Sequence, residues 1–254
     1  MPGLVVIAGG SPLARRVAGA VAHAFPDAVH IEPQSTPRKA LLRARVRRHG
    51  IVKALGQVAF RALSVRLTAR KESRIDDIWQ RAGIAQSTPP AAQMYQTSSV
   101  NSRETQNLLR RLNPDLVFVF GVPKLLAPAL GATAAPFINL HPGATPMYRG
   151  VHTGYWALAN NDVSCFSATI HVIDNGLDTG PIIRKVSATP GAQDNVATYN
   201  QLLVVSALPA LFDVLTRYLR KAELEALSAG PPNPIFHEPT LWGYLSTGLQ
   251  RGVW

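Results

Sequence analysis

The stretch "LVVIAGGSPLARRVAGAVAHAF" (residues 4–25) predicts how the chain begins to fold. Its first seven residues are an apolar run that ends in two glycines, which is typical of a buried strand followed by a tight turn. Ser11 is a suitable N-cap and Pro12 suits the first position of a helix. A strand, a glycine turn and a helix N-terminus form a site where anions bind. We therefore expect Gly10 and Ser11 to contact an anionic group of a ligand.

The same alternation of strand and helix continues along the chain. Apolar runs predict further strands at residues 27–33, 116–120, 136–141, 165–174 and 181–189. Helical patterns lie before the strand at 116–120 and from Asp194 to about Arg220. These repeats predict an α/β fold, with a mostly parallel Rossmann-like sheet and helices on both faces. In such sheets ligands bind beyond the carboxyl ends of the strands.

Composition limits the classes of protein. The 254 residues, of which 46% are hydrophobic, suffice for one large α/β domain with a sizeable core. Cys165 is the single cysteine, so an internal disulfide and a cysteine-based zinc cluster are excluded. The start, "MPGLVVIAGG", has no basic region, and its apolar run is too short to span a bilayer. We expect a cytoplasmic protein with no membrane partner.

The positive charge is concentrated in one segment. Twelve Lys and Arg residues lie between Arg38 and Arg74 against one acid, Glu72, so this segment carries the whole net charge of +11. Its apolar residues have the spacing of two amphipathic helices broken near His49-Gly50. We predict a basic helical insertion at about residues 36–80. Such a stripe is either a solvated helix face or a surface for phosphates, nucleic acid or an anionic membrane.

The insertion divides an otherwise regular α/β chain. Residues 1–225 are expected to form one domain that contains it. Residues 226–254 are rich in proline and aromatic residues, and we expect them to pack on that domain as a tail.

The segment "NLHPGATPMYRG" (residues 139–150) places an amide and an imidazole at the end of a predicted strand. The amide of Asn139 can donate to a carbonyl oxygen that becomes negative, and His141 can move a proton near neutral pH. Pro142 and Pro146 stiffen the chain that follows. Taken alone, the pair is better explained by a capping amide and a buried histidine at a strand end.

A second segment, "DNGLDTG" (residues 174–180), supplies a carboxylate. Gly176 and Gly180 allow a tight loop that brings Asp178 back toward His141, where it would hold the imidazole ring. No serine or cysteine stands in a nucleophile-elbow motif, so the nucleophile must come from the substrate, most simply an amine. The three side chains predict acyl transfer.

Together, "INLHPGATPMYRG" and "TIHVIDNGLDTGPII" resemble the folate-dependent formyltransferases, which act on glycinamide ribonucleotide, methionyl-tRNA or sugar amines. The resemblance covers approximately Pro114 to Thr189 strongly and the N-terminal strand and helix weakly. It implies the formyltransferase fold, no metal, and catalytic roles for Asn139, His141 and Asp178. Asn139 and protonated His141 would stabilise the oxyanion, and Asp178 would support the imidazole and help to move the proton.

The resemblance also implies 10-formyltetrahydrofolate as the formyl donor. The folate pocket would be formed by Asn139 and by two segments: Lys124, Leu125 and Leu126, then Asp174, Asn175, Gly176 and Leu177. The acceptor would be bound by Gly10, Ser11, Arg149, Gly150 and His152. For Arg149 and His152 an exposed arginine and a structural histidine are the alternatives, and His171 is expected to be structural.

The favoured acceptor is a small anionic amine, most simply a nucleotide-linked amino sugar. Glycinamide ribonucleotide comes second, because "GGSPLAR" keeps only part of the phosphate turn of those enzymes. The short tail argues against tRNA, so no nucleic-acid partner is expected, and a homodimer is compatible with the sequence. Two rivals remain open: a non-catalytic polyanion-binding protein on the same fold, and a hydrolase that transfers the formyl group to water.

Overall fold

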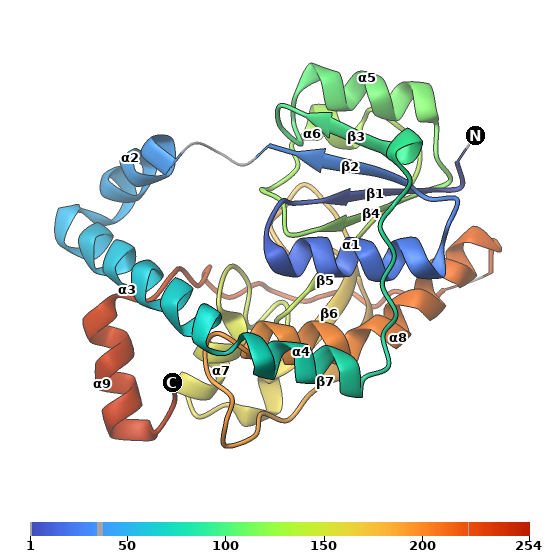
Figure 1. The fold of residues 1–254 in the computed structure, drawn as a ribbon. Coiled ribbons are helices and arrows are strands. Elements are labelled where there is room, and N and C mark those ends of the chain that lie inside the picture. The colour runs from blue at the N-terminus through green and yellow to red at the C-terminus, as the bar shows by residue number, and fades with distance from the viewer. Residues whose placement is uncertain (1, 35–37, 223) are drawn as a thin grey trace.

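A seven-stranded mixed sheet with the order β3-β2-β1-β4-β5-β6-β7 forms the centre of the protein (Figure 1). The structure is a computed structural model that describes residues 2–34, 38–222 and 224–254. The first five strands are parallel, and β6 and β7 are antiparallel to their neighbours. The strands are β1 (Leu4–Ala8), β2 (Val29–Pro33), β3 (Met94–Thr97), β4 (Leu116–Phe120), β5 (Phe137–His141), β6 (Ser167–Val172) and β7 (Ile182–Ser187).

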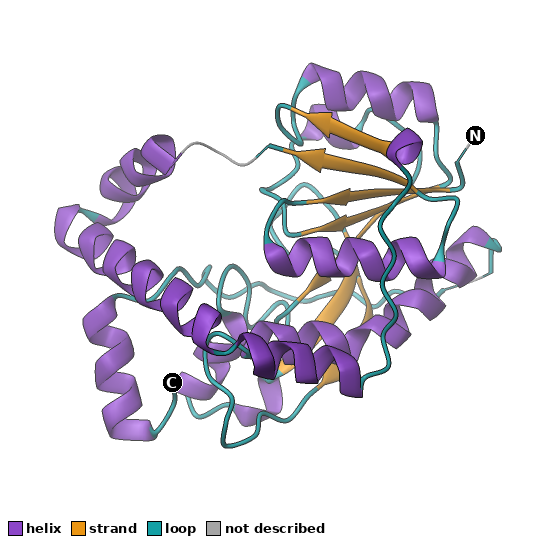
Figure 2. Cartoon of the chain, in the orientation of Figure 1, coloured by secondary structure: helices purple, strands orange, loops and turns teal. Residues whose placement is uncertain are grey.

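Helices cover both faces of this sheet (Figure 2). Alternate residues of each central strand point to opposite faces, so Val6 and Phe118 pack in one core while Val5 and Val117 pack in the other. The first core is covered by α1 (Pro12–Ala24), α4 (Glu72–Arg81) and α8 (Tyr199–Leu219). The second is covered by α5 (Arg103–Leu112), which lies beside α6 (Ala127–Leu130). The predicted α/β class with a mostly parallel sheet is confirmed.

Among the described residues, α8 alone is long and apolar enough to cross a membrane by length and composition. It packs against β6 and β7, and its Leu203, Leu208 and Leu211 are fully buried. In this protein α8 is therefore a core helix of the sheet layer.

Helices α2 (Arg38–His49) and α3 (Ile51–Arg70) extend away from the sheet, and we call them the arm (Figure 1). They separate at Gly50, whose φ of +79° suits glycine, as the sequence predicted. Residues 36 and 37 of the predicted insertion lie outside the described residues. Helix α4 follows α3 and packs against α8.

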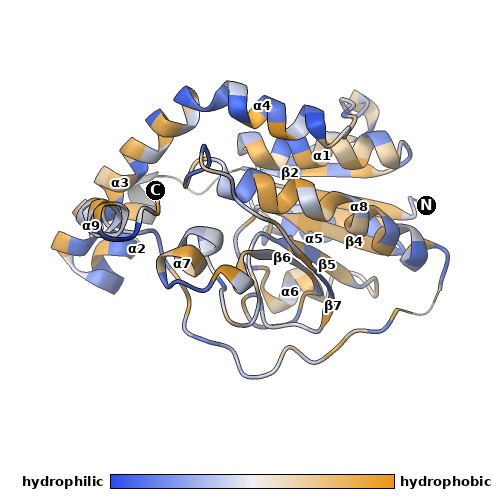
Figure 3. Ribbon diagram, turned by 90° about the horizontal axis from the view of Figure 1, so that it is seen from below, coloured by the Kyte–Doolittle hydropathy of each residue, from blue (hydrophilic) through white to orange (hydrophobic). Residues whose placement is uncertain are grey.

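The apolar residues of the arm are less buried than those of amphipathic helices that lie flat on a domain surface. Helix α3 buries Ala54, Gly56, Gln57 and Phe60. An apolar set on its other side is exposed: Ile51, Val52, Leu55, Val58 and Val65. Blue and orange alternate along the arm in Figure 3. The reason is the position of α3. Because this helix extends away from the sheet, only one narrow side of it contacts the rest of the protein, which we call the body.

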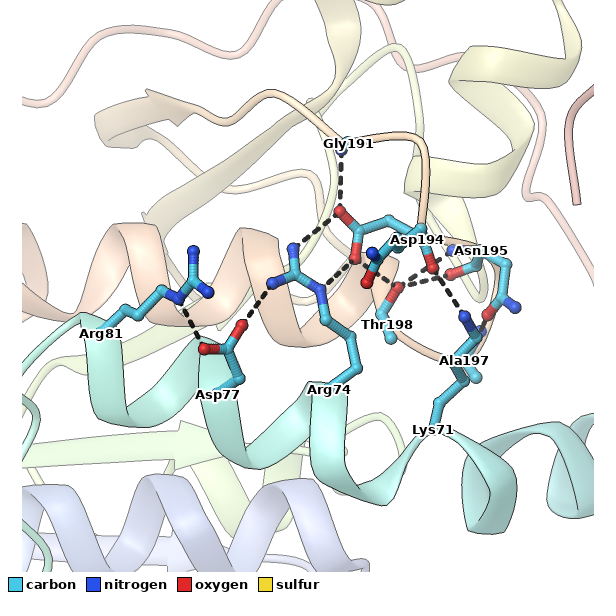
Figure 4. A network of polar contacts seen from close by, with 10 residues as sticks. Lys71, Arg74, Asp77, Arg81, Gly191, Asp194, Asn195, Ala197 and Thr198 are labelled. Carbon is cyan, nitrogen blue, oxygen red and sulfur yellow. Dashed lines mark hydrogen bonds and ion pairs between the residues drawn. The ribbon is translucent and has the colours of Figure 1, made fainter.

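An ion-pair network fixes α4 to the loop that precedes α8 (Figure 4). The guanidinium of Arg74 donates to both carboxylate oxygens of Asp194, at 3.0 and 3.1 Å, and to Asp77 at 2.7 Å. The Asp194 side chain is fully buried and also accepts from the N–H of Gly191. Burial alone would raise the pKa of Asp194, but these hydrogen bonds outweigh it and lower that pKa. Arg74, counted in the basic stripe, is thus a structural residue.

The C-terminal residues include a helix, α9 (Leu241–Arg251), that the sequence analysis did not predict. Thr240 caps it, and the ring of Trp242 lies against Gly56 of α3, where a Cβ would be 2.3 Å away. Helix α9 therefore supports the arm. The division into a catalytic domain (residues 1–225) and a tail (residues 226–254) is kept as a proposal.

Candidate active site

The predicted amide and imidazole lie on one strand at the carboxyl end of the sheet. Asn139 and His141 belong to β5, and each faces a residue of the antiparallel strand β6, His171 and Thr169 respectively. Their neighbours Ile138 and Leu140 point into the core under α8, so both polar side chains point to the opposite face. One face of β5 therefore carries both groups.

His171 orients the Asn139 amide. Nδ1 of His171 lies 2.9 Å from the carbonyl oxygen of Val172, which can only accept, so this nitrogen carries the proton. Nε2 is then an acceptor, and Asn139 Nδ2 donates to it at 3.1 Å. Burial lowers the pKa of His171, which keeps the ring neutral. One N–H of the amide is thus fixed, and the second remains for a ligand. The sequence analysis treated His171 as structural and missed this position.

His141 and Asp178 meet as the sequence predicted. Nδ1 of His141 lies 3.6 Å from Oδ2 of Asp178, and both side chains are largely buried. Nε2 of His141 is buried without a hydrogen-bond partner. It lies next to Gly143, where a Cβ would be only 2.8 Å away. A side chain at residue 143 would clash with this nitrogen and with Thr153, so glycine is required here.

The loop that carries Asp178 is held by its own side chains. Both oxygens of Asp174 accept from the hydroxyl of Thr179, and one also accepts from the N–H of Gly176. A Cβ on Gly176 would lie 1.7 Å from that hydroxyl, and one on Gly180 would lie 1.8 Å from the carbonyl of Val172. The two glycines are therefore required for the turn that returns Asp178 to His141.

A cleft of about 50 Å³ lies beside these groups. Its lining is mixed: Val119, Val122, Pro123, Lys124, Leu125, Asn139, His171, Ile173, Asp174, Gly176, Leu177 and Asp178. Leu126 is half exposed, and neither it nor Asn175 lines the cleft. His141 is not part of this lining. Pockets for organic ligands typically reach about 300 Å³ or more, so the cleft is narrow.

Asn101 fixes the wall formed by Lys124 and Leu126. Its Nδ2 donates to the carbonyl of Lys124 at 2.9 Å, and its Oδ1 accepts from the N–H of Leu126 at 2.8 Å. The sequence analysis missed this residue, because a lone asparagine 23 residues before its partner carries no local signal.

Gly10 and Ser11 lie two strands from Asn139, on the order of 10 Å away. The Ser11 hydroxyl caps α1 by accepting from the N–H of Ala14. Gly10 faces the carboxylate of Glu32, where a Cβ would be 2.9 Å from Oε1. Glu32 is itself paired with Arg15 at 2.9 Å, so the turn faces one charge of each sign.

Arg149 and Gly150 contact the loop that carries Asp178 directly. The N–H of Gly150 donates to Asp178 Oδ2 at 3.2 Å. Arg149 donates to the carbonyl of Leu177 at 2.9 Å and to that of Asn233 at 2.6 Å. Its guanidinium therefore joins the loop to the C-terminal residues.

His152 lies away from the cleft, in a pocket between the arm and the body. It adopts a left-handed conformation, with φ of +52°, before α7 (Thr153–Ala159). Its ring meets Phe60 edge-on at 5.4 Å. Burial, with a smaller effect from Arg61, lowers the pKa of His152 to about 4. Within the described residues no group of three or more His, Cys, Asp or Glu side chains is placed to hold a metal.

The comparisons with known proteins all indicate the same family. Residues 35–215 match the formyl transferase family. The chain is 32% identical over 110 residues to a methionyl-tRNA formyltransferase of Thermodesulfovibrio yellowstonii, covering 43% of this chain and 35% of the relative. It is 31% identical over 117 residues to the phosphoribosylglycinamide formyltransferase of Escherichia coli, covering 46% and 54%. The alignments thus span between a third and about half of these relatives.

Solved structures share the fold at lower identity. The 4-N formyltransferase from Francisella tularensis superimposes with a TM-score of 0.58 and 13% identity, covering 96% of this chain and 78% of that one. An N-formyltransferase from Helicobacter canadensis, in complex with folinic acid and dTDP-3-aminofucose, has a TM-score of 0.54 and 16% identity, covering 93% and 71%. These similarities show a common fold.

Proposed function

The chain belongs to the formyl transferase family, and from this premise we propose that it transfers a formyl group from 10-formyltetrahydrofolate to a primary amine. The observation that carries the proposal is the geometry of His141. Its Nδ1 faces Asp178 at 3.6 Å, while its buried Nε2 has no partner and lies on the same strand face as the Asn139 amide.

The side chains suit the two charges that arise in formyl transfer. As the amine nitrogen bonds to the formyl carbon, Asn139 and protonated His141 donate to the oxygen that becomes negative. Asp178 supports the charged imidazole. It also helps the amine proton to reach the folate nitrogen as the bond from that nitrogen to the formyl carbon breaks.

The residues that line the cleft suit a pterin chemically, but the space between them is small. Apolar side chains such as Val122, Leu125 and Leu177 suit a flat ring, and the backbone of residues 174–177 offers polar groups for its edge. At about 50 Å³ the space is too small for the ring. Binding therefore requires the walls at Lys124–Leu126 and Asp174–Leu177 to separate.

We propose a nucleotide-linked amino sugar as the acceptor, with glycinamide ribonucleotide second. The positive charge of the arm supports an anionic acceptor. A cytoplasmic location and a homodimer stay predictions.

Formyl transfer is tested by incubating the protein with 10-formyltetrahydrofolate and a panel of nucleotide-linked amino sugars and glycinamide ribonucleotide. The expected result is an amine-dependent formamide product. Release of formate at the same rate without any amine would identify a hydrolase instead. Salt-sensitive binding to polyanions with neither reaction would favour the non-catalytic alternative.

A further inference from the structure

A pocket of about 440 Å³ lies between the arm and the body, and we call it the arm pocket. The arm contributes Arg45, Arg48 and Arg61 to its lining, and the body contributes His152, His237 and Glu238. Its volume is within the range of small-molecule sites. Unlike the narrow cleft at Asn139, it has room for a ligand as it stands.

The arm pocket has more positive than negative charge. Glu238 is the one carboxylate in its lining, and it pairs with Arg45 and, at 3.6 Å, with Arg61. Arg48 is exposed and has no hydrogen bond or ion pair within the described part of the chain. One carboxylate cannot balance three guanidinium groups, so the pocket attracts an anion.

The nearby positive charge affects the pKa of two histidines that line the arm pocket. The rings of His49 and His237 meet at 4.6 Å. Burial and the nearby cations, including Arg48, lower the pKa of both. Both rings are therefore neutral near pH 7, and as neutral rings they can donate to an anion without adding charge.

Two buried polar atoms in the arm pocket lack partners. Gln57 is 1% exposed, and its Nε2 donates to the carbonyl of Glu238, but its Oε1 has no partner. Nδ1 of His152 is also buried without a partner. An unsatisfied buried polar group is unfavourable, and a ligand hydroxyl that donates to Gln57 Oε1 would remove that penalty. The fitting ligand has an anionic group next to hydroxyl groups.

The arm pocket is close to the candidate active site. Val151 and His152 line it and directly follow Gly150, whose N–H donates to Asp178. Two residues of chain span at most about 8 Å. The arm pocket therefore adjoins, through Val151 and Gly150, the residue whose N–H holds Asp178.

On the basis of the proposed function, we propose that the arm pocket binds the phosphate or diphosphate of the formyl acceptor. The arm is then the acceptor-binding element of this chain. Arg48, unpaired in the range that the structure describes, supplies the positive charge for the phosphate, and Oε1 of Gln57 accepts a hydrogen bond from a neighbouring hydroxyl of the ligand.

The test measures binding of inorganic pyrophosphate and of UDP to the whole protein by calorimetry. Arg48→Glu should weaken both at least about tenfold, because it reverses a charge inside the pocket. Arg47→Glu is the matched control: it is the neighbouring exposed residue of α2, makes the same charge change and does not line the pocket. It should change the affinity less than about twofold. Gln57→Leu should weaken UDP more than pyrophosphate, which has no sugar hydroxyl.

Catalysis is separated from binding by Asn139→Ala, which should lose turnover and keep the wild-type affinity for pyrophosphate. Equal effects of Arg47→Glu and Arg48→Glu, or no pyrophosphate binding at millimolar concentration, would overturn the proposed pocket while leaving formyl transfer intact. Tighter binding of a short RNA hairpin, weakened equally by both Arg variants, would also overturn it, in favour of a diffuse nucleic-acid surface.

Discussion

The amide of Asn139 donates to Nε2 of His171 across the β5–β6 pair, at 3.1 Å. His171 is 2% exposed, and its other ring nitrogen bonds to the backbone of its own strand, so the amide is held by a rigid neighbour. A rigid donor stabilises a developing charge better than a mobile one, because no reorganisation is needed during the reaction.

The first prediction concerns this neighbour. His171→Ala should lower kcat about tenfold or more with little change in the KM for folate, since it frees the amide without removing it. His171→Gln, whose carbonyl oxygen can accept from Asn139, should recover part of the loss. Steady-state kinetics and a thermal melt check this result. A fall in melting temperature alone, with normal kcat, would reduce His171 to a structural residue.

The proposed catalytic roles of Asn139 and His141 give the second prediction. Asn139→Ala and His141→Ala should each lower kcat about 100-fold or more, with the fold retained. Initial rates and circular dichroism are the measurements. His23→Ala, on the exposed end of α1, is the control and should react at the wild-type rate. Normal turnover in either active-site variant would contradict the assigned roles.

The third prediction concerns the ion pair that attaches α4. Arg74→Met should lower the free energy of unfolding by about 3 kcal/mol, because it leaves the buried carboxylate of Asp194 without its cation. Arg70→Met, at an exposed position of α3, should cost less than about 0.5 kcal/mol. Urea unfolding at neutral pH measures both, and equal values would show that the pair contributes nothing.

The same pair has a pH dependence with a defined sign. The pKa of Asp194 is lowered in the folded protein, so its contribution is present above the pKa of the unfolded chain. That contribution is lost as the pH falls through the lowered folded value. Wild-type protein should therefore lose more stability on acidification below pH 4 than the Arg74→Met variant.

His152 gives the fourth prediction. Its pKa falls from 6.5 to about 4 on folding, so the unfolded chain binds a proton that the folded protein does not. Stability is full above pH 6.5 and decreases as the pH falls toward 4, by up to about 3 kcal/mol.

The test is His152→Asn, since asparagine tolerates the left-handed conformation at this position. Unfolding free energies measured between pH 7 and 4.5 should decrease less steeply in this variant than in the wild type. His23→Asn should keep the wild-type slope. An unchanged slope in His152→Asn would show that other groups, such as the buried His30, cause the acid sensitivity.

Strongly patterned segments were predictable from the sequence, and long-range pairings were not. The strand at Leu116–Phe120 is five apolar residues and was placed correctly. Strand β3, "MYQT", is a short edge strand with no apolar run, and it was missed. Helix α9 was missed because Gly243 and Gly248 weaken its helical pattern, although Gly248 provides the space for the Trp254 ring.

The candidate site followed the same rule. The Asn139, His141 and Asp178 grouping was visible because two short motifs carry it. His171 depends on the antiparallel register of β5 with β6, which the sequence does not display. The position of the arm depends on contacts such as that of Gln57 with Glu238, which are 181 residues apart.

The separation of the arm from the sheet has a consequence for how such a protein can diversify. The groups proposed to act on the formyl carbon lie between Asn101 and Asp178 in the sequence, whereas the arm is a separate helical segment that precedes them. The residues that select the acceptor can thus change during evolution while those proposed to carry out the reaction stay the same. Exchanging the arm between homologues is then a route to new products from an old reaction.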